Sequence, residues 1–134
     1  MERIKPDFSL SLKRYWFAKI WNGEKTVEYR KVGPKYKRFA DWLGKRRGIF
    51  FMLYIGMMPT GPRLLVQVKE ISIGKCPIEG FDGDYYAISF EIVQAYMFDH
   101  GTYFPMTEMP RTMLLQFRCW YSAMRLGFLT VKKY

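Results

Sequence analysis

Residues 11–31 have the sequence SLKRYWFAKIWNGEKTVEYRK, and we expect the rest of the chain to be organised around them. Spacing typical of a helix runs over residues 12–21, with Ser11 as the expected N-cap. Gly23 can adopt the left-handed conformation that ends a helix. From residue 26 onward, β-branched and aromatic side chains favour a strand. The residues near the apolar face of the helix are Phe17, Ile20 and Trp21.

The strand that follows Gly23 carries the strongest chemical signal in the chain. The two-residue alternation of a strand places Val27 and Tyr29 on one face and Glu28 and Arg30 on the other. We expect Val27 and Tyr29 to face the core, so Glu28 and Arg30 should point away from it. A helix beside this outward face would make it the floor of a cleft, with Lys25 at its lip. Two cations and a carboxylate would then converge.

Four further strands are expected, at residues 8–12, 49–55, 64–73 and 85–93. The second is a nearly continuous apolar run, typical of a buried central strand, and the third alternates in a way that suits an antiparallel hairpin partner. Residues 101–110 suggest an irregular connection. A terminal helix from Pro110 to Gly127 and an edge strand at residues 128–131 should follow.

The pattern as a whole predicts a single α+β domain over residues 1–134. We expect its strands to curl into a small β-barrel flanked by short helices. Helical periodicity near the end of the chain predicts a C-terminal elaboration from about residue 107.

A second helical signal follows Pro34, where Tyr36, Phe39, Ala40 and Leu43 repeat at helical spacing. The opposite side of this helix and the turn after it are basic. Their cations are Lys35, Lys37, Arg38, Lys45, Arg46 and Arg47. We expect this surface to contact phosphates without distinguishing base sequence.

Composition indicates a folded, basic protein. The chain has 22 Lys and Arg against 12 Asp and Glu, a formal charge of +10, which attracts polyanions such as RNA or DNA. A solvated basic surface is the alternative explanation of that charge. With 11 Phe, 10 Tyr and 4 Trp, disorder is not expected.

Cys76 and Cys119 lack the spacing of a zinc site, and we expect both to be free thiols of a cytoplasmic monomer. No apolar run approaches the ~20 residues that cross a bilayer.

Other candidate site residues lie in the second half of the chain. The acidic loop residues are Glu79, Asp82 and Asp84. They are compatible with Mg²⁺ or Mn²⁺, but a turn rich in Gly and Asp explains them equally simply and is the interpretation we prefer. His100 could form half of an acid and base pair, although a lone loop histidine is more often solvated. Of Tyr85 and Tyr86, alternation buries one; we expect Tyr85 to be exposed and able to stack on a base, a contact worth ~1–3 kcal/mol.

The pattern Gly-x-Lys-x-x-Glu-x-Arg at residues 23–30, after a strand and a short helix, resembles the ASCH domain family. That family has a fold similar to the RNA-binding PUA β-barrel. The resemblance continues more loosely across residues 8–93. It implies a cleft lined by Lys25, Glu28 and Arg30 that binds RNA or a nucleoside.

Some members of the ASCH family are hydrolases. One activity is amidohydrolysis of an acetylated cytidine, in which a motif lysine, a threonine and a separate glutamate are implicated, and another is metal-dependent cleavage of RNA. Lys25 matches the lysine, whereas Glu28 holds the position of the threonine. The candidates for the separate carboxylate are Glu79, Asp82 and Asp84.

We therefore expect an RNA- or nucleotide-binding domain with a basic cleft. If it is a hydrolase, Lys25 and Glu28 are its candidate catalytic residues, and no resident cofactor is expected beyond a divalent metal. The residues expected to contact nucleic acid are Lys25, Arg30, Lys35, Lys37, Arg38, Arg46, Arg47 and Tyr85. The alternative function is a protein-interaction module, an inhibitor or coactivator, whose basic aromatic surface binds an acidic protein.

Overall fold

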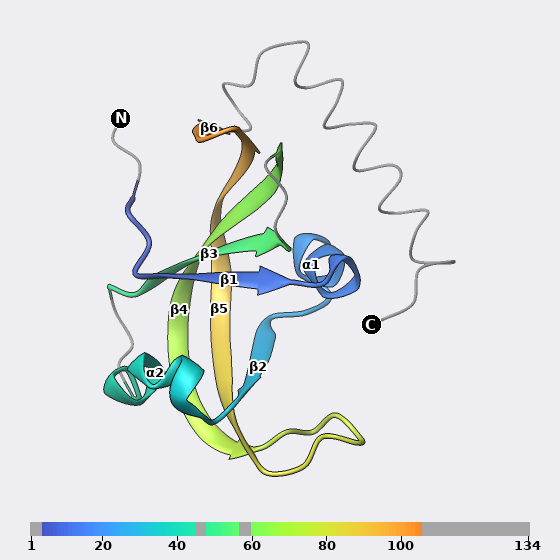
Figure 1. Cartoon of the computed structure of the whole chain (residues 1–134), viewed down its shortest axis with the longest axis vertical. Coiled ribbons are helices and arrows are strands. Elements are labelled where there is room, and N and C mark those ends of the chain that lie inside the picture. Colours follow the sequence, from blue (N-terminus) through green and yellow to red (C-terminus); the bar gives the residue numbers. More distant parts are fainter. Residues whose placement is uncertain (1–3, 45–47, 57–59, 106–134) are drawn as a thin grey trace.

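In the part of the chain that the structure describes, a mixed sheet of six strands and two short helices form an α+β fold (Figure 1). The computed structural model describes residues 4–44, 48–56 and 60–105. The strands are β1 (Phe8–Leu12), β2 (Val27–Lys31), β3 (Phe50–Ile55), β4 (Thr60–Lys75), β5 (Asp84–Asp99) and β6 (Thr102–Pro105). The helices are α1 (Arg14–Trp21) and α2 (Arg38–Asp41), and the 3₁₀ turn η1 (Pro34–Tyr36) precedes α2.

The strand order is β1-β3-β4-β5-β2, and β6 also pairs with β5. Only the β1 and β3 pair is parallel among the described strands. Figure 1 shows β4 and β5 as two long strands that β1 and β3 cross. No backbone ladder joins the outer strands β1 and β2 in the described part of the chain, so the sheet is not closed into a barrel.

The main core lies on one face of this curved sheet and is closed by α1 and α2. Phe17 and Ile20 of α1 and Phe39 of α2 are almost completely buried in it. A smaller cluster of Met52, Leu65 and Tyr96 is separate from it. Leu65 of β4 belongs to this second cluster, whereas its neighbours Leu64 and Val66 belong to the main core.

The first helix begins later than its sequence pattern predicts. Ser11 is the fourth residue of β1, and the N-cap of α1 is Lys13, whose side chain makes no capping hydrogen bond. The ladder with β3 continues to the pair Leu12 and Ile55, so strand pairing prevails over the local capping preference of Ser11. The expected end of the helix is confirmed, because Gly23 has a φ of 79°.

The second helix is shorter than expected and packs through a different stripe. Tyr36, Phe39 and Trp42 pack together, whereas Ala40 and Leu43 are exposed. The packed residues are three apart because the segment opens as a 3₁₀ turn, which has three residues per turn. The α-helical spacing expected here was therefore wrong in its details.

The strands expected at residues 8–12, 49–55 and 64–73 are confirmed, and the last two form an antiparallel hairpin. β5 is longer than expected, and β6 occupies part of the stretch expected to be irregular. The predicted terminal helix and the strand at residues 128–131 lie outside the described residues. Among the helices of residues 4–44, 48–56 and 60–105, none is long and apolar enough to span a membrane.

Candidate functional site

A cleft of about 570 Å³ lies where β1, α1, β2, η1 and the loop between β4 and β5 meet. Among the described residues, four cations and one carboxylate line it: Lys13, Lys25, Arg30, Lys31 and Glu28. Five aromatic side chains line it as well: Trp16, Tyr29, Tyr36, Phe81 and Tyr85. The cleft is therefore positively charged and has largely aromatic walls.

The two faces of β2 are the reverse of those expected. Glu28 pairs with Ile88 and Arg30 with Tyr86 in the antiparallel ladder, and directly paired residues lie on the same face of a sheet. Ile88 and Tyr86 belong to the main core, and only 7% of Glu28 is exposed. The prediction that Glu28 and Arg30 point away from the core was wrong.

Val27 and Tyr29, expected in the core, are only half-buried and lie outside the core cluster. Apolar alternation misassigned the faces because a charged residue can be buried when its charge is paired and its hydrogen bonds are made. In β2 the charged residues supply that pairing themselves.

Glu28 and Arg30 form the centre of a buried ionic network. Arg30 donates from Nε and Nη2 to Glu28 Oε2 at 3.1 and 2.8 Å, and Lys25 Nζ lies 3.3 Å from Glu28 Oε1. Arg30 also donates to the Tyr36 hydroxyl at 2.9 Å and to the Ser11 carbonyl at 2.7 Å. Most of the five N–H donors of the guanidinium are thus used within the protein.

The network also holds Arg30 in its charged form. Burial acts to lower the pKa of Arg30, but the charge of Glu28 and the hydrogen bond to Tyr36 outweigh it, and the net pKa is raised. The bond to the Ser11 carbonyl joins β2 to β1, the two outer strands of the sheet. Arg30 therefore acts first as a bridge across the open side of the sheet.

Lys25 is placed differently from Arg30. Its ammonium lies 5.0 Å from the centre of the Trp16 ring and 5.4 Å from that of Tyr29, and Glu28 is its carboxylate partner. An ammonium has three N–H donors, so one ion pair leaves donors for an anionic ligand. Lys25 is the motif cation best placed to contact a ligand.

Tyr85 is not exposed, contrary to the prediction. Only 8% of Tyr85 is accessible, because the loop between β4 and β5 folds back and sets the Phe81 ring 5.9 Å from that of Tyr85. Tyr86 is buried as well, as a member of the main core. Cys76 lies in the same loop, is a free thiol and lines the cleft. Tyr85 still contributes to the cleft wall, but most of its side chain is covered, so it does not offer an exposed ring face on which a base could stack.

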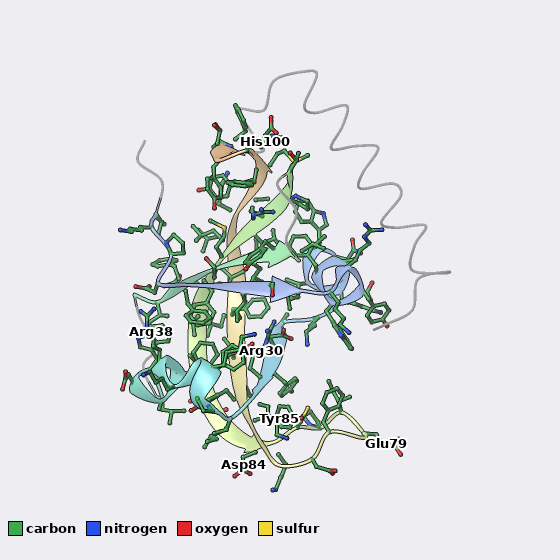
Figure 2. All side chains as sticks on the ribbon, viewed as in Figure 1. Arg30, Arg38, Glu79, Asp84, Tyr85 and His100 are labelled. Atoms are coloured by element: carbon green, nitrogen blue, oxygen red, sulfur yellow. The ribbon has the colours of Figure 1, made fainter. Side chains whose placement is uncertain are left out.

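The basic residues around α2 lie outside the cleft lining. Figure 2 shows Arg38 beside α2, away from Arg30, and the Arg38 guanidinium lies 4.9 Å from the Trp42 ring. Lys35 and Lys37 are exposed on the same segment. Arg46 and Arg47, together with Lys45, fall outside the described residues.

The acidic loop does not form a site with the motif. Figure 2 shows Glu79 at the outer end of the loop and Asp84 at its base, where Asp84 pairs with Lys75 at 3.3 Å. Asp82 is exposed between them. Within the residues that the structure describes, no group of three His, Cys, Asp or Glu side chains could hold a metal ion.

His100 lies at the far end of β5 from the cleft (Figure 2). It occupies the turn before β6, with a φ of 44°, and its Nδ1 is 2.7 Å from Asp99 Oδ1. Thr60 donates to the same carboxylate at 2.9 Å, and these two hydrogen bonds lower the pKa of Asp99. His100 therefore cannot pair with Lys25 or Glu28 as an acid or base.

The cleft residues that the sequence did not reveal include Ser11, Lys13, Trp16 and Phe81. Trp16 lies next to Phe17 on α1, is partly buried against the main core and also lines the cleft. Ser11 contributes a backbone carbonyl, and Phe81 reaches the cleft through the path of a loop. Neither has a local sequence signature.

Comparison of the chain with protein-family models, with curated proteins and with solved structures finds no match.

Proposed function

We propose that this protein binds RNA or a nucleotide in the cleft beside β2. The observation that carries the proposal is the meeting of four cations, one carboxylate and five aromatic rings in one cleft. Nucleotides combine an anionic phosphate with a flat base. The cations of the cleft can bind the phosphate, and its aromatic rings can stack on the base. A volume of about 570 Å³ falls within the ~300–1,000 Å³ usual for ligand pockets.

The contacts divide the roles of the motif residues. Lys25 would neutralise phosphate, because its ammonium retains donors beyond its pair with Glu28. Arg30 would act as a positioning residue, because its donors already hold Glu28, Tyr36 and the Ser11 carbonyl. The base would lie against the aromatic wall.

The resemblance to the ASCH family supports the same proposal and extends it. It suggests a PUA-type barrel, and the Arg30 bridge between β1 and β2 is consistent with a sheet that curls toward closure. It also suggests hydrolysis of RNA or of a modified nucleoside, with Lys25 and Glu28 at the reacting centre, 3.3 Å apart. A cytoplasmic location remains a prediction.

Calorimetric titration with 5′-AMP and 5′-UMP tests the binding proposal. We expect Lys25→Ala to weaken binding at least about tenfold, the equivalent of one charge-assisted hydrogen bond. The matched control is Lys19→Ala, which removes a nearby lysine that pairs on the surface with Glu24 at 2.7 Å and does not line the cleft. Equal affinities for Lys25→Ala and Lys19→Ala would remove the cleft from the binding site.

The same titration separates nucleotide binding from the alternative function. The exposed cations Lys35, Lys37 and Arg38, outside the cleft, are the observation that favours an acidic protein partner. Such a partner would bind by surface charge. No binding of any nucleotide or RNA by the wild-type protein would refute the proposed function and leave the protein-interaction module as the better explanation.

A further inference from the structure

A second groove, of about 360 Å³, lies next to the cleft and shares Lys25 with it. It is lined by the connection between α1 and β2, by Lys69 of β4 and by residues 89–92 of β5. We propose that the cleft and this groove together bind two consecutive nucleotides of a single strand, so that the ligand is an oligonucleotide rather than a free mononucleotide. This inference rests on the proposed function of the cleft.

A β-bulge lies beside the groove, and its extra residue is a lysine. In the ladder of β4 with β5, Val68 pairs with Phe90 and Glu70 with Ser89, so Lys69 is the extra residue. Val68 is buried, yet both Lys69 and Glu70 are exposed. Regular alternation would have turned one of these two charged residues inward. The bulge keeps both of them exposed. Bulges are over-represented next to functional sites, and the extra residue of this one, Lys69, lines the groove.

The groove has the donors and the apolar surface that a nucleotide needs. Lys25 stands at the junction with the cleft and Lys69 lies on the β4 side, with Glu91 as a loose surface partner of Lys69 at 3.8 Å. Thr26 contributes a hydroxyl suited to a phosphate or ribose oxygen. Ile92 offers an apolar side chain that is 42% exposed.

The shared lysine defines the path of the strand. One nucleotide would occupy the cleft, and Lys25 would contact the phosphate that links it to the next. The second nucleotide would lie along the groove, with Lys69 near its phosphate and Ile92 under its base or sugar. This arrangement selects single strands, because a paired base could not turn into the cleft.

The test compares the 5′-phosphorylated mononucleotides pA and pU with the dinucleotides pApA and pUpU by calorimetric titration. We expect each dinucleotide to bind at least about fivefold more tightly, as expected for one added nucleotide contact worth about 1 kcal/mol. Lys69→Ala should remove most of that gain and leave mononucleotide affinity unchanged. The matched control is Lys75→Ala. Lys75 is an exposed lysine of the same strand and lines neither the cleft nor the groove.

Two adjacent residues of β5 provide a second, sharper pair of variants. Ile92 and Val93 are equally exposed, at 42% and 41%, but only Ile92 lines the groove. Ile92→Glu should repel the second phosphate and lower dinucleotide affinity at least about fivefold, whereas Val93→Glu should not. Folding of both variants is checked by circular dichroism, and Lys69→Ala keeps the test decisive if Ile92→Glu fails to fold.

The outcomes separate this inference from the proposed function. Mononucleotide binding with no gain for dinucleotides would overturn the second site and leave the cleft intact. Equal effects of Ile92→Glu and Val93→Glu, or of Lys69→Ala and Lys75→Ala, would also overturn it, because only general charge would then matter. Failure of both ligand lengths to bind would overturn the two proposals together.

Discussion

Arg30→Ala should destabilise the protein, even though Arg30 belongs to the candidate binding site. Arg30 holds the buried carboxylate of Glu28 and also reaches the Tyr36 hydroxyl and the Ser11 carbonyl on the opposite outer strand. The sequence alone suggested that these charges point outward and support little of the core. The structure reverses that expectation, because the side chains of Arg30 and Glu28 are only 16% and 10% exposed.

The expected loss of stability depends on the interactions that the Glu28 carboxylate keeps after Arg30→Ala. Glu28 would keep one cation, Lys25, at 3.3 Å, and would lose both guanidinium hydrogen bonds. Removing one partner of a fully buried ion pair costs about 3–5 kcal/mol. Since Glu28 keeps Lys25 and some solvent contact remains, we expect a loss of about 2–4 kcal/mol in the free energy of unfolding. For a chain of this size the Tm should fall by roughly 8–16 °C.

Urea and thermal unfolding followed by circular dichroism measure this loss. Arg38→Ala is the matched control, since Arg38 lies over the exposed side of Trp42 and its loss should cost about 1 kcal/mol or less. The double variant Arg30→Ala/Glu28→Leu removes both charges and should be more stable than Arg30→Ala alone. A Tm for Arg30→Ala within about 2 °C of the wild-type value would refute the bridging role of Arg30.

Three further predictions follow from other parts of the structure. Glu28→Gln should lower both nucleotide affinity and the free energy of unfolding, the latter by about 1–3 kcal/mol, because a buried amide cannot replace the charge that Arg30 shares; unchanged denaturation curves would contradict this. The double variant Lys35→Ala/Lys37→Ala should reduce the slope of log affinity for single-stranded RNA against log salt by about 1.4, and an unchanged slope would show that these lysines make no phosphate contacts. Asp99 has a lowered pKa, so it stabilises the fold above its unfolded-state pKa near 3.8 and loses this effect as the pH falls through the lower folded-state value. The Tm difference between wild type and Asp99→Asn should therefore be larger at pH 6 than at pH 2, and a pH-independent difference would disprove the linkage.

The sequence predicted the elements that depend on local pattern. Apolar runs located the central strands, and Gly23 correctly marked the end of α1. Ser11 misled because strand pairing with β3, a contact distant in sequence, extends β1 beyond it. The capping preference of one residue contains no information about a strand that pairs with it from a distant part of the sequence.

The convergence of the motif residues was predicted, but the geometry of the candidate site was not. The motif spacing brought Lys25, Glu28 and Arg30 together, yet alternation assigned Glu28 and Arg30 to the wrong face of β2. Charged residues were assumed to face solvent, and burial through mutual pairing has no signature in hydropathy. Tyr85 was misplaced for a related reason, since its burial depends on how the loop that carries Phe81 folds back.

The bridge made by Arg30 has a consequence for the behaviour of the protein at high concentration. β1 and β2 end the strand order, and an outer strand with unpaired backbone groups is a template for association with another chain. Arg30 occupies the Ser11 carbonyl on one of these strands while it is anchored on the other. Loss of the side chain would free the Ser11 carbonyl on β1, so a weakened bridge should appear first as intermolecular strand exchange or aggregation, before the core itself unfolds.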